Sequence, residues 1–392
     1  MERRRFLFKA LFWLGATPLY LKFLFHSKGE NLAKALAMGA VAPASEWARH
    51  SHLSLREIAS RKLHHRGERF TNPFIVGTSA LPHAQGRHGS LWRFLYWKLI
   101  AKNKFSHLYH REEVRPVTID WNEIEEKKGL AITFIKHATL LIKDAGRYIL
   151  IDPVFLGLFP FIKDFTPLFG MSSIPAIDYL LITHGHYDHL DIPSIRSLPN
   201  SPHAIAPLGY EGLLHRGGVK EVLSLDWFQY HEMGGLRITL LPCYHWTMRN
   251  PFKGVNTALW GSFLIETETG PTVFISGDTA YFQGFKELGE EYSVDLAIFN
   301  LGAYEPRWFM KHSHLNPQEV ITAFQDLKAR HLMVVHWGTF RLGDEPVFYP
   351  PLELKGEMER AGILDRFIPL YHGQTLSYPA TIGADNKKPP SA

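Results

Sequence analysis

The chain has 392 residues, of which 45% are hydrophobic and 21% are charged, an ordinary composition for a globular protein with one large core or two smaller ones. The formal net charge of +5 is modest, and we find no Lys/Arg-rich block with interleaved aromatic residues in the body of the chain, so no nucleic-acid partner is expected. The single cysteine, Cys243, excludes an intramolecular disulfide framework and a cysteine-rich zinc site, so metal ligands must be histidines and carboxylates.

The segment 1–45 differs in kind from the rest. Arginines at positions 3–5 precede an apolar and aromatic stretch over residues 6–25, which is typical of a signal peptide or signal anchor. The Arg-Arg-x-Phe-Leu order also resembles a twin-arginine export signal, and small-residue triplets at 35–37 and 40–42 are of the kind that export peptidases cut. A helix lying in the headgroup region is the third interpretation. We expect membrane association through residues 6–25, or export if the segment is cleaved.

The segment 46–125 is rich in histidine, arginine and aromatic residues and has no sustained period. Only residues 90–105 show apolar side chains at three- and four-residue spacing, which predicts a helix. We interpret the segment as an N-terminal extension of the main domain. Its histidines share no motif with a partner, so they are expected at the surface or behind ligands rather than as ligands. They include His64, His65, His107 and His110.

The main domain is predicted over residues 126–378, followed by a tail at 379–392. It contains two series of short apolar runs that read as strands, and a helix is predicted from Asn316 to Ala329, outside the sheets. Two series of strands with helices outside favour an α/β sandwich of two packed sheets. The main runs are at 131–135, 139–142, 148–151 and 179–182, then at 262–266, 272–276, 296–299 and 332–335.

A polar cluster, Thr-His-Gly-His-Tyr-Asp-His at residues 183–189, follows the apolar run 179–182. Four side chains of metal-binding type would repel one another or stay unpaired if buried, whereas one or two divalent cations would satisfy all of them. The alternative is a solvated histidine-rich loop, but the complete HxHxDH pattern after an apolar strand is a strong signal. The four candidate ligands are His184, His186, Asp188 and His189.

Three later strands each end in one more residue of this kind: His245, Asp278 and His336. Each alone has an ordinary explanation, as an aromatic packing partner, a turn aspartate or a core histidine. Together with the four residues of the cluster they form a set of seven, which is the number that a two-metal site needs.

This succession resembles the metallo-β-lactamase superfamily and, within it, the N-acylphosphatidylethanolamine-hydrolysing phospholipase D family, over roughly residues 70–350. Lys136 stands where family members usually carry glycine. The resemblance implies an αββα sandwich, here with an N-terminal extension and a hydrophobic N-terminal segment. It is carried by Phe70-Thr71-Asn72-Pro73, His137-Ala138-Thr139, Ile151-Asp152-Pro153, the cluster itself, Pro242-Cys243-Tyr244-His245-Trp246, Gly277-Asp278-Thr279, Gly302-Ala303-Tyr304-Glu305-Pro306-Arg307 and His336-Trp337-Gly338-Thr339.

The resemblance also implies the roles of individual residues. Zinc is expected for both ions, with iron and manganese as alternatives. Two close cations lower the pKa of a shared water toward about 7, and Asp278 and Asp188 are the predicted catalytic carboxylates. His137 is expected to hydrogen-bond rather than to ligate. One ion would be held by His184, His186 and His245, the other by Asp188, His189 and His336, with Asp278 bridging, and Tyr187 and His314 would contact substrate.

The predicted function is therefore a dinuclear zinc phosphodiesterase of the phospholipase D type, which hydrolyses N-acylphosphatidylethanolamine-like lipids to N-acylethanolamine and phosphatidate. The same metal shell also suits a lactone or ester hydrolase and a nuclease, and the lack of a basic groove argues against the nuclease. A metal-stabilised membrane scaffold is the non-enzymatic alternative, although all seven ligand positions are filled. The expected partners are a phospholipid substrate and a membrane surface, and a homodimer is left open.

Overall fold

The structure is a computed structural model that describes residues 53–74, 87–160, 162–166, 173–250 and 252–378. The predicted signal or anchor segment and the tail at 379–392 lie outside these residues. Within the described part of the chain, no helix has both the length and the hydropathy that a membrane span requires.

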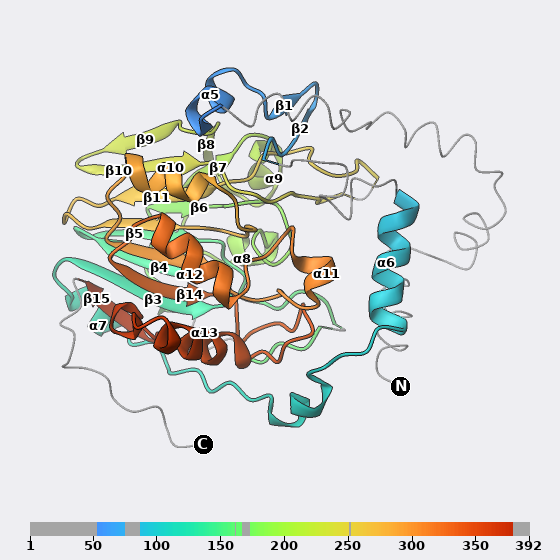
Figure 1. The fold of residues 1–392 in the computed structure, drawn as a ribbon. Coiled ribbons are helices and arrows are strands. Elements are labelled where there is room, and N and C mark those ends of the chain that lie inside the picture. Colours follow the sequence, from blue (N-terminus) through green and yellow to red (C-terminus); the bar gives the residue numbers. More distant parts are fainter. Residues whose placement is uncertain (1–52, 75–86, 161, 167–172, 251, 379–392) are drawn as a thin grey trace.

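Two sheets pack face to face (Figure 1), as the two series of apolar runs predict. The seven-stranded sheet contains, in spatial order, β15 (Thr375–Tyr378), β3 (Leu130–Lys136), β4 (Thr139–Asp144), β5 (Arg147–Ile151), β6 (Tyr179–Leu181), β7 (His203–Pro207) and β8 (Glu221–Leu225). The six-stranded sheet contains β14 (His331–Val335), β13 (Leu296–Asn300), β12 (Thr272–Ile275), β11 (Ser262–Glu266), β10 (Leu236–Leu241) and β9 (Tyr230–Met233).

Alternation along the strands separates two cores. Leu140 and Ile142 of β4 belong to the core between the sheets, whereas Leu141 belongs to a core on the outer face of the first sheet. This is the period of two that a strand imposes on its side chains. The outer core is completed by Ile195 and Leu214, which lie on two short helices. These helices are α8 (Ile192–Arg196) and α9 (Glu211–Arg216).

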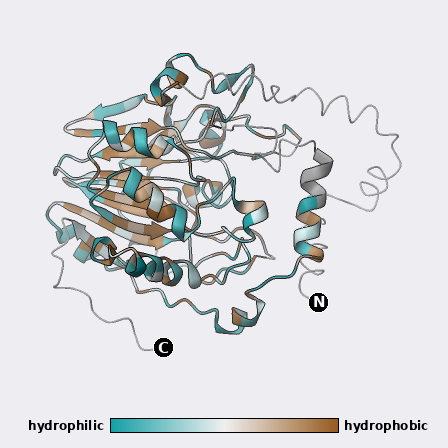
Figure 2. Cartoon of the chain, in the orientation of Figure 1, coloured by the Kyte–Doolittle hydropathy of each residue, from teal (hydrophilic) through white to brown (hydrophobic). Residues whose placement is uncertain are grey.

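Three longer helices cover the outer face of the second sheet (Figure 1). Their inward-facing apolar residues, such as Phe285 and Phe324, are fully buried, and their solvent-facing residues are mostly hydrophilic (Figure 2). The helix predicted from Asn316 is confirmed, since Asn316 caps it and forms a capping box with Glu319. The architecture is therefore the predicted αββα sandwich. The helices are α10 (Gly284–Glu291), α12 (Pro317–Asp326) and α13 (Tyr349–Arg360).

The N-terminal extension is held to the sandwich by hydrogen bonds between side chains. His64 is fully buried, and the two carboxylate oxygens of Asp226 lie 2.6 Å from Nε2 of His64 and 2.7 Å from Nε2 of His65. We call these three residues the clasp. The helix predicted over 90–105 is found at Arg87–Leu99. The elements of the extension are α5 (Leu55–Ser60), β1 (His65–Arg66), β2 (Arg69–Phe70), α6 (Arg87–Leu99), the 3-10 helix η1 (Ser106–Arg111) and α7 (Trp121–Glu126).

Candidate metal centre

Four strand ends bring the seven predicted ligands to one edge of the sandwich. The strand β6 leads into the histidine-rich cluster, and β10, β12 and β14 lead to His245, Asp278 and His336. In the second sheet, β12, β13 and β14 run parallel, and β10 has the same direction because two antiparallel pairings separate it from β12. The ligand-bearing loops of that sheet therefore lie at the same edge.

The first ligand group consists of His184, His186, His245 and Asp278, and one ligand atom from each lies within 4.8 Å of all the others. His186 Nδ1 is 2.9 Å from His184 Nε2 and 3.3 Å from His245 Nε2. The Oδ2 atom of Asp278 is 3.7 Å from the same nitrogen of His184. Ligand atoms at about 2.0–2.1 Å from a tetrahedral zinc ion are about 3.4 Å apart, so this spacing fits such an ion.

The second ligand group contains Asp188, His189 and His336, with Asp278 beside it. His336 Nε2 lies 3.4 Å from Asp188 Oδ2 and 3.2 Å from Asp278 Oδ1. His189 Nε2 lies 3.3 Å from Asp278 Oδ2. Asp278 thus faces both groups, as a bridging carboxylate must.

The donor atoms themselves fit a metal. The Nε2 atoms of His189 and His336 are buried and make no hydrogen bond of acceptable geometry among the described residues. Burying such atoms without a partner is costly, and a cation would remove that cost. The arrangement therefore indicates a site built for cations rather than a packed histidine core.

The protonation states also suit metal binding. Burial lowers the pKa of His184 well below its usual value and that of His186 to about 4. Burial acts in the opposite sense on Asp278, but the adjacent His189 holds the pKa of this carboxyl well below its usual range. Neutral imidazoles and ionised carboxylates are the forms that bind metal ions. His184, His186 and Asp278 are in these forms, whereas His189, whose pKa Asp278 and Asp188 raise against the effect of burial, would release a proton when a metal ion binds.

A second layer of hydrogen bonds orients the ligands. Asp152 Oδ2 lies 2.7 Å from Nδ1 of His189, and the backbone carbonyl of Ser313 lies 3.0 Å from Nδ1 of His245. Asn300 donates to Asp278 Oδ1 at 2.9 Å. Such partners fix the ring tautomer and raise ligand basicity. The sequence analysis did not single out Asn300. It directly follows an apolar run, so the strand-end argument that found Asp278 could have found it too.

His137 makes the hydrogen bond that the resemblance implies. Its Nε2 atom lies 3.2 Å from Asp188 Oδ2, and its ring stacks 4.0 Å from that of His336. The same atom also belongs to the set of Asp188, His189 and His336 whose ligand atoms lie within 4.8 Å of one another. Burial lowers the pKa of His137 to about 3, so the ring is neutral. The neighbouring Lys136, in the place of the family's glycine, is buried and pairs with Asp164 at 2.6 Å.

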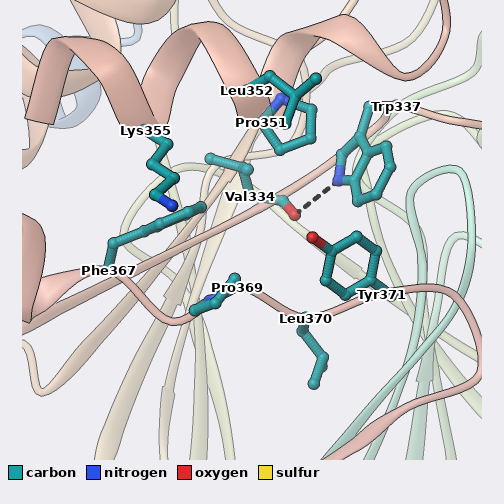
Figure 3. Close-up of a pocket in the computed structure, with 9 residues that line it drawn as sticks. All are labelled: Val334, Trp337, Pro351, Leu352, Lys355, Phe367, Pro369, Leu370 and Tyr371. Carbon is teal, nitrogen blue, oxygen red and sulfur yellow. Dashed lines mark hydrogen bonds between the residues drawn. The ribbon is translucent and has the colours of Figure 1, made fainter. Parts of the chain in front are cut away.

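His336 has a left-handed backbone with φ of 70°. A Cβ atom at Gly302 would lie 2.1 Å from the carbonyl oxygen of His336, so only glycine allows this approach. On the far side, the Trp337 indole donates to the carbonyl of Val334 at 3.2 Å and packs against Tyr371 (Figure 3). The backbone at His336 is therefore held in place by the close approach of Gly302 and by the contacts of the next residue, Trp337.

The two predicted substrate contacts differ in position. His314 is not a surface histidine, because only 13% of its side chain is exposed and its Nδ1 atom lies 3.9 Å from Asp278 Oδ2. Tyr187 is 43% exposed at the rim. Its hydroxyl donates to the carbonyl of Arg249 at 3.0 Å, and the guanidinium of Arg249 lies 4.0 Å over its ring. Sequence reasoning missed Arg249, which shares no motif with the cluster.

Comparison with known proteins agrees with this geometry. Residues 147–337 match the model of the beta-lactamase superfamily domain. The fold is similar to that of a protein from Veillonella parvula described as a possible metal-dependent hydrolase (TM-score 0.52, 18% identity, 64% of this chain and 99% of the other). It is also similar to that of an isothiocyanate hydrolase from Delia radicum gut bacteria (TM-score 0.50, 17% identity, 64% and 99%). The fold and the site define a metal-dependent hydrolase.

Proteins with similar sequences identify the family more closely. An N-acyl-phosphatidylethanolamine-hydrolyzing phospholipase D of Caenorhabditis elegans is 30% identical over 265 residues, or 62% of this chain and 73% of the relative. The mitochondrial enzyme of the same name from Saccharomyces cerevisiae is 35% identical over 205 residues, or 50% of this chain but 44% of the relative. An uncharacterized protein of Mycobacterium tuberculosis is 30% identical over 278 residues, 65% and 70% of the two chains. The chain belongs to the metallo-β-lactamase superfamily, with phospholipases D of this kind among its homologues.

Proposed function

We propose that the protein is a dinuclear zinc phosphodiesterase that hydrolyses N-acylphosphatidylethanolamine-like phospholipids to N-acylethanolamine and phosphatidate. The observation that carries the proposal is the position of His314. Its side chain is aimed at Asp278, between the two ligand groups, yet it belongs to neither group. A buried donor next to a dinuclear centre suits a phosphoryl oxygen that gains charge during displacement. The names of the worm and yeast relatives support the same substrate class.

Each residue then has a defined task. When bound, the two ions would supply a hydroxide nucleophile at neutral pH and offset the charge of the phosphodiester. Asp278 and Asp188 would accept a hydrogen bond from the attacking water and orient it toward phosphorus. His314 would donate to a phosphoryl oxygen, and Tyr187, held by Arg249, would contact the headgroup at the rim.

Apolar residues at the rim suit a lipid. Leu156 and Phe252 are 58% and 78% exposed, and they lie on the loops that also carry Phe159 and Arg249. The rings of Phe159 and Tyr187 are 5.3 Å apart. Acyl chains could contact these side chains while the phosphate reaches the centre. We further propose that the enzyme is membrane-associated, through residues 6–25 or, after cleavage, through its folded surface.

The decisive experiment identifies the bond that breaks. Metal-loaded protein in oxygen-18 water should convert N-acylphosphatidylethanolamine to phosphatidate that contains one solvent oxygen, as read by mass spectrometry. His314→Ala should reduce this turnover by about ten- to a thousandfold, the range for one lost transition-state donor, with metal content unchanged.

The matched control is His312→Ala. This half-buried histidine lies 3.2 Å from the Tyr244 hydroxyl, two residues from His314 and outside both ligand groups, so its loss should leave turnover near that of the wild type. A wild-type enzyme that opens lactones rapidly but leaves phospholipids intact would refute the phosphodiesterase assignment in favour of the ester-hydrolase alternative.

A further inference from the structure

An exposed apolar patch lies where α6 meets α11 (Arg307–Met310). Tyr96, Leu99 and Ile100 of α6 and the turn after it are 50%, 44% and 69% exposed. They are three and four residues apart, so they share one side of the helix. Trp308 of α11, 41% exposed, joins them with its ring 5.8 Å from that of Tyr96. We call these four residues the docking patch.

A neighbouring side of α6 is packed. Trp97 is only 3% exposed, donates from its indole to Asp344 at 3.0 Å and lies 5.0 Å from the ring of Phe309. Arg93 adds a hydrogen bond of 2.7 Å to the carbonyl of Trp308. The helix is therefore attached through Trp97 and Arg93, while the three apolar residues of the docking patch on α6 and the turn after it stay exposed. Apolar residues mark this C-terminal end of α6 in Figure 2.

The stretch of chain that carries most of the docking patch is basic, although Glu305, just before α11, pairs with Lys104. Between residues 87 and 111 the chain has six lysines and arginines and no aspartate or glutamate. This stretch interleaves cations with aromatic residues, so the expectation that the chain has no such block is wrong at this place. Lys98 extends over the Trp97 ring at 3.5 Å, with its apolar stem along the aromatic surface. Basic side chains around an apolar centre complement an anionic surface.

The chemistry of the docking patch favours a lipid surface over a nucleic acid. Leu99 and Ile100 are the patch residues that decide this, because exposed aliphatic side chains have nothing to offer a phosphate backbone, whereas Tyr96 and Trp308 suit either partner. Tryptophan and tyrosine prefer the headgroup level of a bilayer, aliphatic residues enter below it, and lysines reach back to anionic headgroups. A short helix that lies flat on the bilayer allows aromatic, aliphatic and basic side chains each to reach the depth that they prefer.

The docking patch is connected to the metal centre by a short, fixed segment. Arg307, next to Trp308, donates to the carbonyl of His314 at 2.9 Å. In the same segment, the carbonyl of Ser313 lies 3.0 Å from His245 Nδ1. Contact with a membrane at α11 would therefore be made by the same loop that positions the candidate substrate histidine.

We propose that α6 and α11 dock the enzyme on an anionic phospholipid bilayer and present the metal centre to lipids of that bilayer. The lipid substrate rests on the proposed function, whereas docking itself does not require catalysis.

The first experiment measures docking alone. Cys243 is the only cysteine and is buried, so Ile100→Cys in the full chain can be labelled selectively with an environment-sensitive fluorophore. Vesicles of phosphatidylcholine and phosphatidylglycerol should shift the emission of this label to the blue, and phosphatidylcholine alone should shift it less. The matched control is Met233→Cys, a position on β9 that is 50% exposed. Both proteins share any attachment through residues 6–25, so the difference between the labels reports the docking patch.

The second experiment measures whether the docking patch contributes to hydrolysis of lipids in vesicles. Leu99→Ser combined with Ile100→Ser should raise the apparent KM for substrate in vesicles by about tenfold or more, since two apolar anchors are lost. Hydrolysis of a short-chain, monomeric substrate should not change. Equal responses at positions 100 and 233, or none at 100, would overturn the proposal. A blue shift of the label at position 100 without vesicles, caused only by a higher protein concentration, would also overturn it, because it indicates that a second copy of the chain covers the patch. A blue shift caused by an oligonucleotide would overturn it as well. If docking holds but no phospholipid is cleaved, only the proposed function fails.

Discussion

Asp278 belongs to the first ligand group and also faces the second. Its Oδ2 atom lies between 3.3 and 3.9 Å from nitrogens of His189, His184, His245 and His314, while Oδ1 faces His336 and the amide of Asn300. Loss of its charge should therefore affect both sites together.

Asp278→Asn tests this dependence. Purified wild-type protein should carry close to two transition-metal ions, and the variant should retain less than about half an ion, since a lost bridging ligand weakens both sites by more than the 10–100-fold typical of an outer partner. Elemental analysis of undialysed protein measures this directly. Asp295→Asn is the control, because Asp295 caps the Thr272 amide away from the centre. A variant that kept both ions would rule out bridging.

Several site residues could be predicted from the sequence because of where they stand. His245, Asp278 and His336 each follow a run of apolar residues, and a strand end is where a sheet presents polar side chains. Arg249 could not be predicted, since its role depends on a contact with the Tyr187 ring that only folding creates. A hydrogen-bonding role for His137 was predicted, but its partner, Asp188, was not.

At the scale of elements, the clasp shows what holds the N-terminal extension to the sandwich. His64 stacks on Trp227 at 4.2 Å, and Asp226, between the two histidines, also accepts from the Trp227 amide at 2.8 Å. Burial opposes ionisation of Asp226, but its bonds to His64 and the Trp227 amide lower its pKa to about 2. The ionised carboxylate is therefore the form that stabilises the fold.

Asp226→Asn should reduce the free energy of unfolding by about 1–3 kcal/mol at pH 7, the worth of hydrogen bonds to a charged group. A depressed pKa contributes stability that is present above the unfolded value of 3.8 and is lost as the pH falls toward about 2. The difference between wild type and variant in urea denaturation should accordingly be constant above about pH 4–5 and shrink below it. Glu221→Gln, at an exposed ion pair with His203, is the control. A difference that persisted unchanged at pH 2 would contradict a role for the charge.

The strands could be predicted from the sequence, but the clasp could not, because only the strands have a local pattern. A strand is visible in its own apolar pattern, as in β3, β4 and β14, whereas His64 and Asp226 are separated by 162 positions and neither belongs to a local motif. The helix α6 was predicted over a longer range than it occupies. It ends near Leu99 because the amides of Ile100 and Ala101 both bond to the carbonyl of Tyr96.

At the scale of the whole molecule, the metal centre joins the two sheets. The histidine-rich cluster follows a strand of the first sheet, and His245, Asp278 and His336 follow strands of the second. Ions that bind only the folded arrangement stabilise it by mass action. The sandwich should therefore depend on its metals for stability as well as for chemistry.

Removal of the metals tests this coupling. Treatment with a chelator should lower the unfolding temperature by several degrees or more, given that about 1 kcal/mol corresponds to about 1–4 °C for a domain of this size. Stoichiometric zinc should restore it, as read by differential scanning calorimetry. Asp278→Asn should show little further loss with chelator. An unfolding temperature that is identical with and without metal would argue against ions that bridge the sheets.

The order of the ligands along the chain has a consequence for biosynthesis. The ribosome completes the histidine-rich cluster early, but the last ligand, His336, follows β14, the final strand of the second sheet to be made. Until that strand emerges from the ribosome, the growing chain can offer an ion only part of the set of seven ligands. Binding of ions by the complete ligand set therefore belongs to the end of translation, and until then the histidines of the first half remain open to any other cation that imidazole binds.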